Sequence, residues 1–130
     1  MAKLVYFSQT GQTKNFVNKI STTEIIEITT KDFDVEVSEP FILVMPSYET
    51  NVHPIVIDTA ADFLETADNL THCKGLFGGG NRNFAELFCI TAKILSQEYN
   101  LPLLHEFEFQ GSPFDVKKLE EELFNIENTN

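Results

Sequence analysis

The run Phe41–Met45 constrains the fold of this 130-residue chain more than any other segment. It is the most apolar stretch of the sequence, and Pro46 ends it. A continuous apolar run of this length, bounded by a turn residue, is typical of a strand that is covered on both faces. Such strands occur in parallel sheets that carry helices on either side. The sequence therefore predicts an α/β protein with this segment as a central strand.

Four further strands and four helices are predicted around this segment. β-branched and aromatic residues mark the strands, and apolar residues three or four positions apart mark the helices. The strands are expected at Lys3–Phe7, Glu24–Ile28, Cys73–Phe77 and Leu103–Phe109, and the helices at Lys14–Ile20, Ile55–Leu64, Phe84–Tyr99 and Ser112–Asn125. The polar segment Thr29–Pro40 is expected to be a loop or a short extended segment. Because strands and helices alternate, we expect one layered α/β domain over residues 1–130.

The chain is strongly acidic, with 20 Asp and Glu against 9 Lys and Arg and a formal net charge of −11. We expect no nucleic-acid partner, because phosphate backbones are bound by Lys and Arg. Solubility accounts for most such charges, and a basic docking partner is the functional alternative. No apolar run approaches the roughly 20 residues that span a bilayer, and the first strand begins too early for a signal peptide. The prediction is a cytoplasmic protein without a membrane partner.

The cysteines and histidines give no sign of a reactive centre. Cys73 and Cys89 do not form a Cys-x-x-Cys motif, so we expect buried, reduced thiols. His53, His72 and His105 are too scattered in the sequence for a metal site.

The loop after the first strand, Ser8–Thr13, has the composition of a phosphate-binding turn. The Ser8, Thr10 and Thr13 hydroxyls are possible donors, and Gly11 lets the backbone approach an anion. The helix that follows offers amides without intrahelical partners and the positive end of its dipole. The same residue types also serve as ordinary caps and turns, so this loop alone leaves both interpretations open.

Two other loops are expected beside this one. Ligands of open α/β sheets bind beyond the carboxyl ends of the strands, where the strand order reverses. With the order 2-1-3-4-5, the loops Ser8–Thr13, Pro46–His53 and Gly78–Phe84 converge on one crevice. The third loop opens with three glycines, which are costly in chain entropy and indicate a steric requirement.

Several phosphate chemistries are excluded at this crevice. A Walker A loop needs a Gly-Lys-Ser/Thr ending, which is absent, and a dinucleotide fingerprint needs a glycine where Asn83 stands. A receiver domain needs acidic residues where Ser8 and Gln9 stand, and a Cys-x5-Arg phosphatase needs a cysteine in this loop. What remains is a phosphate held by neutral donors, beside two loops able to hold a flat ring.

Three motifs resemble those of known flavin proteins. The pattern Ser8-x-Thr10-Gly11-x-Thr13 resembles the phosphate loop of flavodoxins, which bind FMN. The segment Gly80–Phe84, Gly-Asn-Arg-Asn-Phe, is similar to the signature of the NrdI family, and Pro46-Ser47-Tyr48 resembles the ring-binding loop of that family. The short crossover Thr29–Pro40 is also similar to that family, and the resemblance covers nearly the whole chain.

The resemblance implies both a fold and a function. The fold is a flavodoxin-like three-layer sandwich, with a five-stranded parallel sheet of order 2-1-3-4-5 and helices on both faces. NrdI proteins are flavodoxin-like partners of class Ib ribonucleotide reductase. The implied cofactor is FMN, and the reduced flavin reacts with dioxygen to supply an oxidant, superoxide. That oxidant assembles the dimanganese–tyrosyl radical cofactor of the small subunit.

The implied partners are the dimanganese or diiron small subunit of the reductase and an unidentified electron donor that reduces the flavin. The chain would thus act as an activating partner. Two alternatives remain: a general electron-transfer flavodoxin, and a binding module that has lost its cofactor. The first shares the phosphate loop but does not account for Gly80–Phe84.

The implied FMN site has three parts. The phosphate would be held by Ser8, Gln9, Thr10, Gly11, Gln12 and Thr13; the ring would be bordered by Pro46, Ser47, Tyr48, Glu49, Thr50 and Asn51; and the opposite wall would consist of Gly79, Gly80, Asn81, Asn83 and Phe84. Tyr48 is the expected stacking side chain because the chain has no Trp, and a surface-loop tyrosine is the alternative. Phe84 is equally compatible with core packing.

Two details of this site are left open by the sequence. Arg82 either contacts a partner or holds the loop in place. The loop Pro46–His53 contains no glycine, and other residues resist a positive φ. Because a peptide of this loop flips with the flavin redox state in many flavodoxin-like proteins, we expect only modest stabilisation of the one-electron-reduced flavin.

Overall fold

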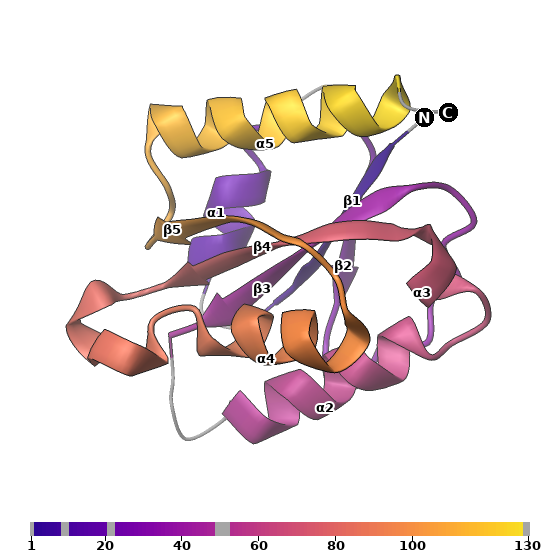
Figure 1. Ribbon diagram of the computed structural model, residues 1–130, viewed down its shortest axis with the longest axis horizontal. Coiled ribbons are helices and arrows are strands. Elements are labelled where there is room, and N and C mark those ends of the chain that lie inside the picture. The colour runs from indigo at the N-terminus through magenta and orange to yellow at the C-terminus, as the bar shows by residue number, and fades with distance from the viewer. Residues whose placement is uncertain (1, 9–10, 21–22, 49–52, 129–130) are drawn as a thin grey trace.

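A computed structural model describes residues 2–8, 11–20, 23–48 and 53–128 as a three-layer α/β sandwich (Figure 1). All strands pair in parallel, in the order β2-β1-β3-β4-β5, which confirms the predicted topology. The strands are β1 (Lys3–Phe7), β2 (Ile25–Ile28), β3 (Phe41–Ser47), β4 (Cys73–Gly80) and β5 (Leu103–Glu108). The helices are α1 (Gln12–Val17), α2 (His53–Leu64), α3 (Asn69–His72), the 3₁₀ segment η2 (Arg82–Leu87), α4 (Ile90–Tyr99) and α5 (Pro113–Glu127).

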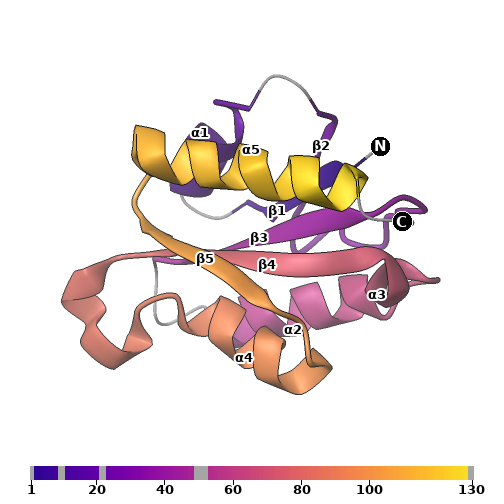
Figure 2. The same cartoon turned by 45° about the horizontal axis from the view of Figure 1, so that its top comes forward.

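The helices cover both faces of the sheet, which explains why β3 is apolar throughout. Helices α1 and α5 lie on one face, and α2 and α4 lie on the other (Figures 1 and 2). Leu43 and Met45 of β3 pack in the cluster that includes α2 and α4, whereas Ile42 and Val44 pack in the cluster that includes α1 and α5. Every residue of β3 is buried. None of the described helices is both long and apolar enough to cross a membrane.

The structure corrects the bounds of four predicted strands. β2 begins one residue later, at Ile25, and β5 ends one residue earlier, at Glu108, whereas β3 and β4 are longer than predicted. β3 continues through Pro46 and Ser47, and β4 continues through all three glycines. The loop predicted to begin at Gly78 therefore begins three residues later, at Asn81.

Gly79 and Gly80 are required by packing. A Cβ on Gly79 would lie 2.8 Å from Phe107 Cζ, and a Cβ on Gly80 would lie 2.9 Å from Cys89 N. Real Cβ contacts essentially never fall below 3.0 Å, so the chain is tightly covered on both faces at this end of β4.

The predicted helix Phe84–Tyr99 is wrong in its first part. Residues Arg82–Leu87 form short 3₁₀ turns that extend beyond the sheet, and α4 begins only at Ile90 (Figure 2). Two residues interrupt a regular helix: Ala85 has φ 52° and ψ −116°, and Cys89 has φ 56°. Positive φ is unfavourable for residues with a Cβ, and neither residue type signals it in the sequence.

The sequence also did not predict α3, whose first residue holds the long loop after β2. Asn69 is fully buried, and its side chain accepts from Val37 N at 2.7 Å and donates to Val35 O and Phe63 O at 2.8 Å. Two of these bonds satisfy backbone groups of the loop predicted at residues 29–40, which forms no strand or helix. The predicted last residues of α2 and α4, Leu64 and Tyr99, are confirmed, and the remaining helix ends differ from the predictions by one to three residues.

Candidate functional site

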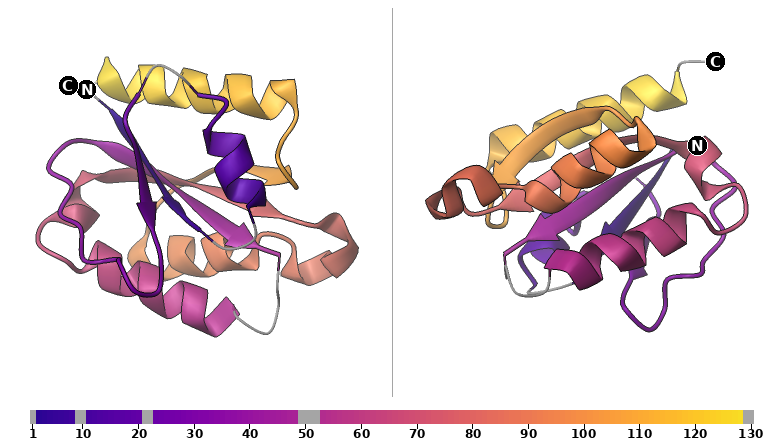
Figure 3. Two further views of the ribbon diagram at one scale, coloured as in Figure 1. Left: turned by 180° about the vertical axis from the view of Figure 1, so that it is seen from behind. Right: turned by 60° about the horizontal axis from the view of Figure 1, so that its bottom comes forward.

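The carboxyl ends of β1, β3 and β4 lie at the same edge of the sheet, and the three predicted loops leave from there (Figure 3). The predicted site residues Gln9, Thr10, Glu49, Thr50 and Asn51 lie outside the described residues. The expected modest stabilisation of the one-electron-reduced flavin depends on the loop Pro46–His53, which is only partly described, and it stays a prediction. The other predicted site residues are placed by the structure as follows.

The first loop leads directly into α1. Ser8 is half-buried, and its backbone N donates to Ile28 O at 2.9 Å. Gly11 has φ 96°, a conformation that L side chains rarely adopt, and its carbonyl accepts from Asn15 N at 2.9 Å. Gly11 and Gln12 are half-buried, and no described atom lies within 4 Å of a Cβ built on Gly11. The backbone is therefore accessible at the position where the sequence predicts an anion.

Thr13 carries the clearest sign of a missing ligand. Its side chain is 1% exposed, and its Oγ1 has no hydrogen-bond partner among the described residues. A buried hydroxyl without a partner is costly, and native proteins normally avoid it. Tyr48, whose hydroxyl donates to Phe109 O at 2.6 Å, is the described neighbour of Thr13 at this edge. A phosphate oxygen at this loop would satisfy Thr13, so the residues present fit the phosphate of FMN.

Tyr48 lies across the strand ends at the same edge. From the end of β3 its side chain passes over β4, where a Cβ on Gly79 would lie 2.6 Å from Tyr48 Oη, and reaches Phe109 O beyond β5. Burial raises the pKa of the Tyr48 phenol, which therefore stays protonated and acts as a donor. Tyr48 thus crosses the end of β4 toward β5. The glycine at position 79 provides the space for it.

The end of β3 is held from the α4 side. Ser47 is fully buried, and its hydroxyl lies 2.8 Å from Thr91 Oγ1. Ser47 therefore presents its backbone, not its side chain, to the edge of the sheet.

His53, at the start of α2, is 7% exposed, and its Nε2 has no hydrogen-bond partner among the described residues. Burial lowers the pKa of His53, so its imidazole stays neutral at neutral pH.

Arg82 helps to hold the third loop in place. Its side chain is 68% exposed, so the alternative, contact with a partner, stays a prediction. Arg82 Nε lies 3.3 Å from Glu108 Oε1, and its backbone N donates to Glu108 Oε2 at 3.1 Å. Its guanidinium carbon lies 4.8 Å from the centre of the Phe88 ring. Asn81 Oδ1 accepts from Asn83 N at 2.9 Å and starts η2. These contacts fix the loop against β5 and the entry to α4.

The predicted wall residues differ in their exposure. Gly79 and Gly80 are buried within β4, where they pair with Pro46 and Ser47 of β3. Asn81 and Phe84 are half-buried, and Asn83 is exposed. The accessible residues of the predicted wall are therefore Asn81, Asn83 and Phe84, whereas the two glycines lie within the sheet.

Sequence reasoning did not identify Glu108, Phe109 or Thr91, although each contacts a predicted site residue. All three belong to β5, its end or α4, and only the folded topology brings them to this edge. Next to Arg82 the structure has a cavity of about 470 Å³, lined by Arg82, Glu106, Phe107, Glu108, Phe109, Gln110, Gly111, Ser112 and Asp115. The accessible surface at the carboxyl ends of the strands therefore extends toward β5, beyond the three predicted loops.

The cysteines take no part in nucleophilic chemistry at this edge. Cys73 and Cys89 are free and buried, as predicted. Burial raises the pKa of both thiols to about 12, so neither is a thiolate at neutral pH.

Comparisons with known proteins agree with the fold and with the resemblance. "Protein NrdI" of Wigglesworthia glossinidia brevipalpis is 40% identical over 124 residues, which cover 89% of this chain and 84% of that protein. A "Putative NrdI-like protein" of Streptococcus pyogenes serotype M18 (strain MGAS8232) is 30% identical over 133 residues, covering 89% and 88% of the two chains. The crystal structure of oxidised Flavodoxin 2 from Bacillus cereus matches with a TM-score of 0.67 at 20% identity, over 97% of each chain.

The flavodoxin likeness establishes the fold, and the family follows from the sequence matches. Residues 4–121 match the family model described as "NrdI Flavodoxin like". This range includes all three loops at the carboxyl edge of the sheet. The predicted resemblance is thus confirmed: the chain belongs to the NrdI flavodoxin-like family.

Proposed function

We propose that residues 1–130 form one FMN-binding domain that activates the small subunit of class Ib ribonucleotide reductase. The observation that carries this proposal is the match of residues 4–121 to the NrdI family, which implies FMN as the cofactor and ribonucleotide reductase as the associated system. The accessible edge above β1, β3 and β4 supports it independently, because it offers neutral donors and an unpartnered buried hydroxyl.

The phosphate of FMN would lie at the first loop. Thr13 Oγ1 would donate to a phosphate oxygen, and Gly11 would allow the backbone to approach closely. Ser8, Gln9, Thr10 and Gln12 would complete this part of the site. The loop contains no Lys or Arg, so amides and hydroxyls alone would balance the phosphate charge.

The flavin ring would lie between the second and third loops. Tyr48 would provide the aromatic surface on one side, with the backbones of Pro46 and Ser47 and the residues Glu49, Thr50 and Asn51 beside it. Gly79, Gly80, Asn81, Asn83 and Phe84 would form the other wall. The contact between Arg82 and Glu108 would keep this wall in place as reductants and partners approach.

Bound FMN would supply the electrons that convert dioxygen into superoxide, the oxidant that the small subunit needs. The residues of this chain would bind and orient the cofactor at an accessible edge, close to the protein surface. An unidentified electron donor would reduce the flavin, and a dimanganese or diiron small subunit would receive the oxidant. The negative charge of the chain favours partners with basic docking surfaces.

A reconstitution experiment tests this proposal. The reduced, FMN-loaded protein is mixed with a dimanganese-loaded class Ib small subunit and dioxygen, and the tyrosyl radical is measured by electron paramagnetic resonance. We expect a radical signal that depends on the flavin. A signal no greater than that of a flavin-free control would contradict the proposal.

The alternative function is general electron transfer, which the structural likeness to flavodoxins leaves compatible with this fold. Rates of electron delivery to unrelated acceptor proteins distinguish the two. A specific activator delivers electrons slowly to such acceptors, whereas a general carrier serves several of them at similar rates.

A further inference from the structure

We propose that Thr91, in the first turn of α4, is a positioning residue for the flavin ring. It acts through Pro46 and Ser47 at the end of β3. This inference rests on the proposed FMN site, because the segment that it positions is the one assigned to the ring.

Thr91 and the end of β3 form a closed hydrogen-bond network. Thr91 Oγ1 donates to Pro46 O at 2.8 Å, and Thr91 N donates to Ser47 Oγ at 3.1 Å. The two hydroxyl oxygens lie 2.8 Å apart. Thr91 and Ser47 are both 0% exposed, so water does not compete for these bonds. We call this set of three bonds the Ser47–Thr91 network.

The direction of each bond follows from the number of donors. Thr91 Oγ1 has one hydrogen, which is used for Pro46 O, so Ser47 must donate in the contact between the hydroxyls. Ser47 Oγ then donates to Thr91 Oγ1 and accepts from Thr91 N. Every hydroxyl in the network is therefore used as a donor and as an acceptor. Removing the Thr91 hydroxyl would take away the side-chain donor to Pro46 O and the acceptor of the Ser47 hydroxyl proton, both in a buried place.

Ser47 also caps α4 from outside the helix. The N-cap residue, Cys89, makes no capping hydrogen bond with its side chain, and its φ of 56° is unusual for a residue with a Cβ. The amides of the first turn of a helix lack intrahelical partners, and Ser47 Oγ accepts from one of them. The end of β3 and the beginning of α4 therefore stabilise each other.

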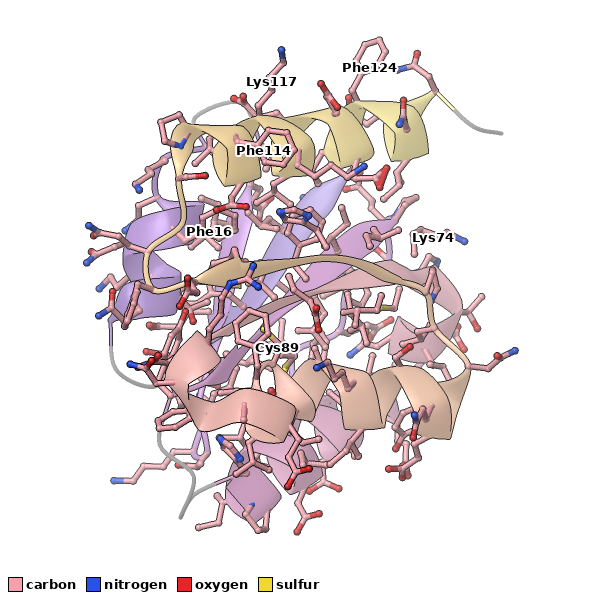
Figure 4. The ribbon with its side chains drawn as sticks, turned by 60° about the vertical axis from the view of Figure 1, so that its left-hand side comes forward. Phe16, Lys74, Cys89, Phe114, Lys117 and Phe124 are labelled. Atoms are coloured by element: carbon pink, nitrogen blue, oxygen red, sulfur yellow. The ribbon has the colours of Figure 1, made fainter. Side chains whose placement is uncertain are left out.

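The same helix end also contacts β4. Cys89, at the start of α4, lies between the helix and the sheet (Figure 4). Its Sγ donates to Gly78 O at 3.2 Å, and its backbone N would lie 2.9 Å from a Cβ on Gly80. α4 thus holds the ends of both strands whose loops would enclose the ring. Because Tyr48 follows Ser47 directly, the network sets the position from which Tyr48 extends over Gly79.

The test compares FMN affinity in three variants that remain folded by circular dichroism. Thr91→Val keeps the shape of the side chain but removes the hydroxyl, and Thr91→Ser retains the hydroxyl. Ser96→Ala is the matched control, since Ser96 Oγ donates to Leu101 O at 2.6 Å near the other end of the same helix. The dissociation constant of FMN and the urea midpoint of the FMN-free protein are measured for each.

We expect Thr91→Val to weaken FMN binding by about tenfold and Thr91→Ser to restore it to within about twofold of the wild type. Ser96→Ala is expected to lower the urea midpoint while leaving FMN affinity unchanged. If Thr91→Val binds FMN like the wild type, or Ser96→Ala weakens binding equally, Thr91 has only a structural role and the inference is wrong. If Thr91→Val does not fold, Ser47→Ala replaces it with the same expectation.

The wild-type measurement separates this inference from the function on which it rests. Wild-type protein that does not bind FMN would contradict the proposed function, and the inference with it. Tight wild-type binding with an unaffected Thr91→Val variant would contradict the inference alone.

Discussion

The hydroxyl of Thr13 is a residue-scale feature that stability alone does not explain. It is buried and has no hydrogen-bond partner among the described residues. Such a donor lowers the stability of the free protein, and a ligand oxygen would compensate it. The stability of the free protein therefore favours a residue without this hydroxyl, whereas ligand binding favours Thr13. A single substitution of Thr13 distinguishes the two effects.

We predict that Thr13→Val weakens FMN binding without lowering the stability of the FMN-free protein. Valine has a similar shape but no unsatisfied donor, so the free energy of unfolding is expected to stay level or to rise by up to about 1 kcal/mol. Urea unfolding and FMN titration measure the two effects. Thr59→Val, a buried threonine of α2, is the control and should leave FMN affinity unchanged. Wild-type affinity in Thr13→Val would refute the assignment of this residue.

His53 makes the stability of the protein depend on pH. Burial lowers the pKa of its imidazole below the ordinary value of 6.5. As the pH falls below that value the unfolded chain binds a proton first, so the folded state loses stability until its own pKa is passed. We predict that His53→Gln reduces the loss of unfolding free energy between pH 7 and 5. Urea unfolding at a series of pH values measures it, and equal slopes for variant and wild type would contradict it.

At the scale of elements, the start of α5 is specified by a local motif. Ser112 Oγ accepts from Asp115 N at 3.2 Å, and Asp115 Oδ2 accepts from Ser112 N at 2.8 Å, which together form a capping box. Asp115 Oδ1 also lies 2.6 Å from His105 Nε2 of β5. Partial burial raises the pKa of Asp115, but hydrogen bonds from His105 and Ser112 outweigh this and keep it below the ordinary value.

We predict that Ser112→Ala lowers the free energy of unfolding by about 1 kcal/mol, the usual cost of losing an N-cap side chain. Ser112→Thr keeps the capping hydroxyl and should retain most of the stability. Urea unfolding near neutral pH is the measurement, since Asp115 is ionised there and its contribution is lost only as the pH falls through its pKa. An alanine variant as stable as the wild type would show that the capping box does not stabilise α5.

The elements that were predicted well have strong local signals, and those predicted badly depend on distant contacts. The bounds of β1 match the prediction because an apolar run ends at a polar turn. The end of β4 was missed because glycines carry no side-chain pattern, and their role is set by Cys89, Phe107 and Tyr48. The break before α4 was missed because positive φ at Ala85 follows from packing, not from the residue type.

In the candidate site, too, some residues were predicted from the sequence and others were not. The three loops follow from their composition and from the strand order, because parallel strands end at one edge of the sheet. Their supports do not follow from local sequence: Glu108 holds Arg82, Phe109 accepts from Tyr48, and Thr91 holds Ser47. Each of these residues is at least 26 positions from its partner, and nothing in the sequence around it indicates the contact.

For the molecule as a whole, the net charge of −11 sets the conditions under which FMN binds. The phosphate of FMN carries a charge of about −2 near neutral pH, so the protein repels its ligand at long range. We predict that the association rate of FMN rises with salt concentration, because salt screens this repulsion. Stopped-flow fluorescence at a series of salt concentrations measures the rate. A rate that falls with salt would indicate a local positive field at the site.

The central claim is that the edge above β1, β3 and β4 binds FMN, and a titration of the cofactor-free protein with FMN tests it most directly. Flavin fluorescence is followed as FMN is added to folded protein. We predict that the fluorescence changes until one FMN is bound per chain and that riboflavin, which lacks the phosphate, binds more weakly. Fluorescence identical to that of free FMN in the presence of excess folded protein would show that this edge does not bind FMN.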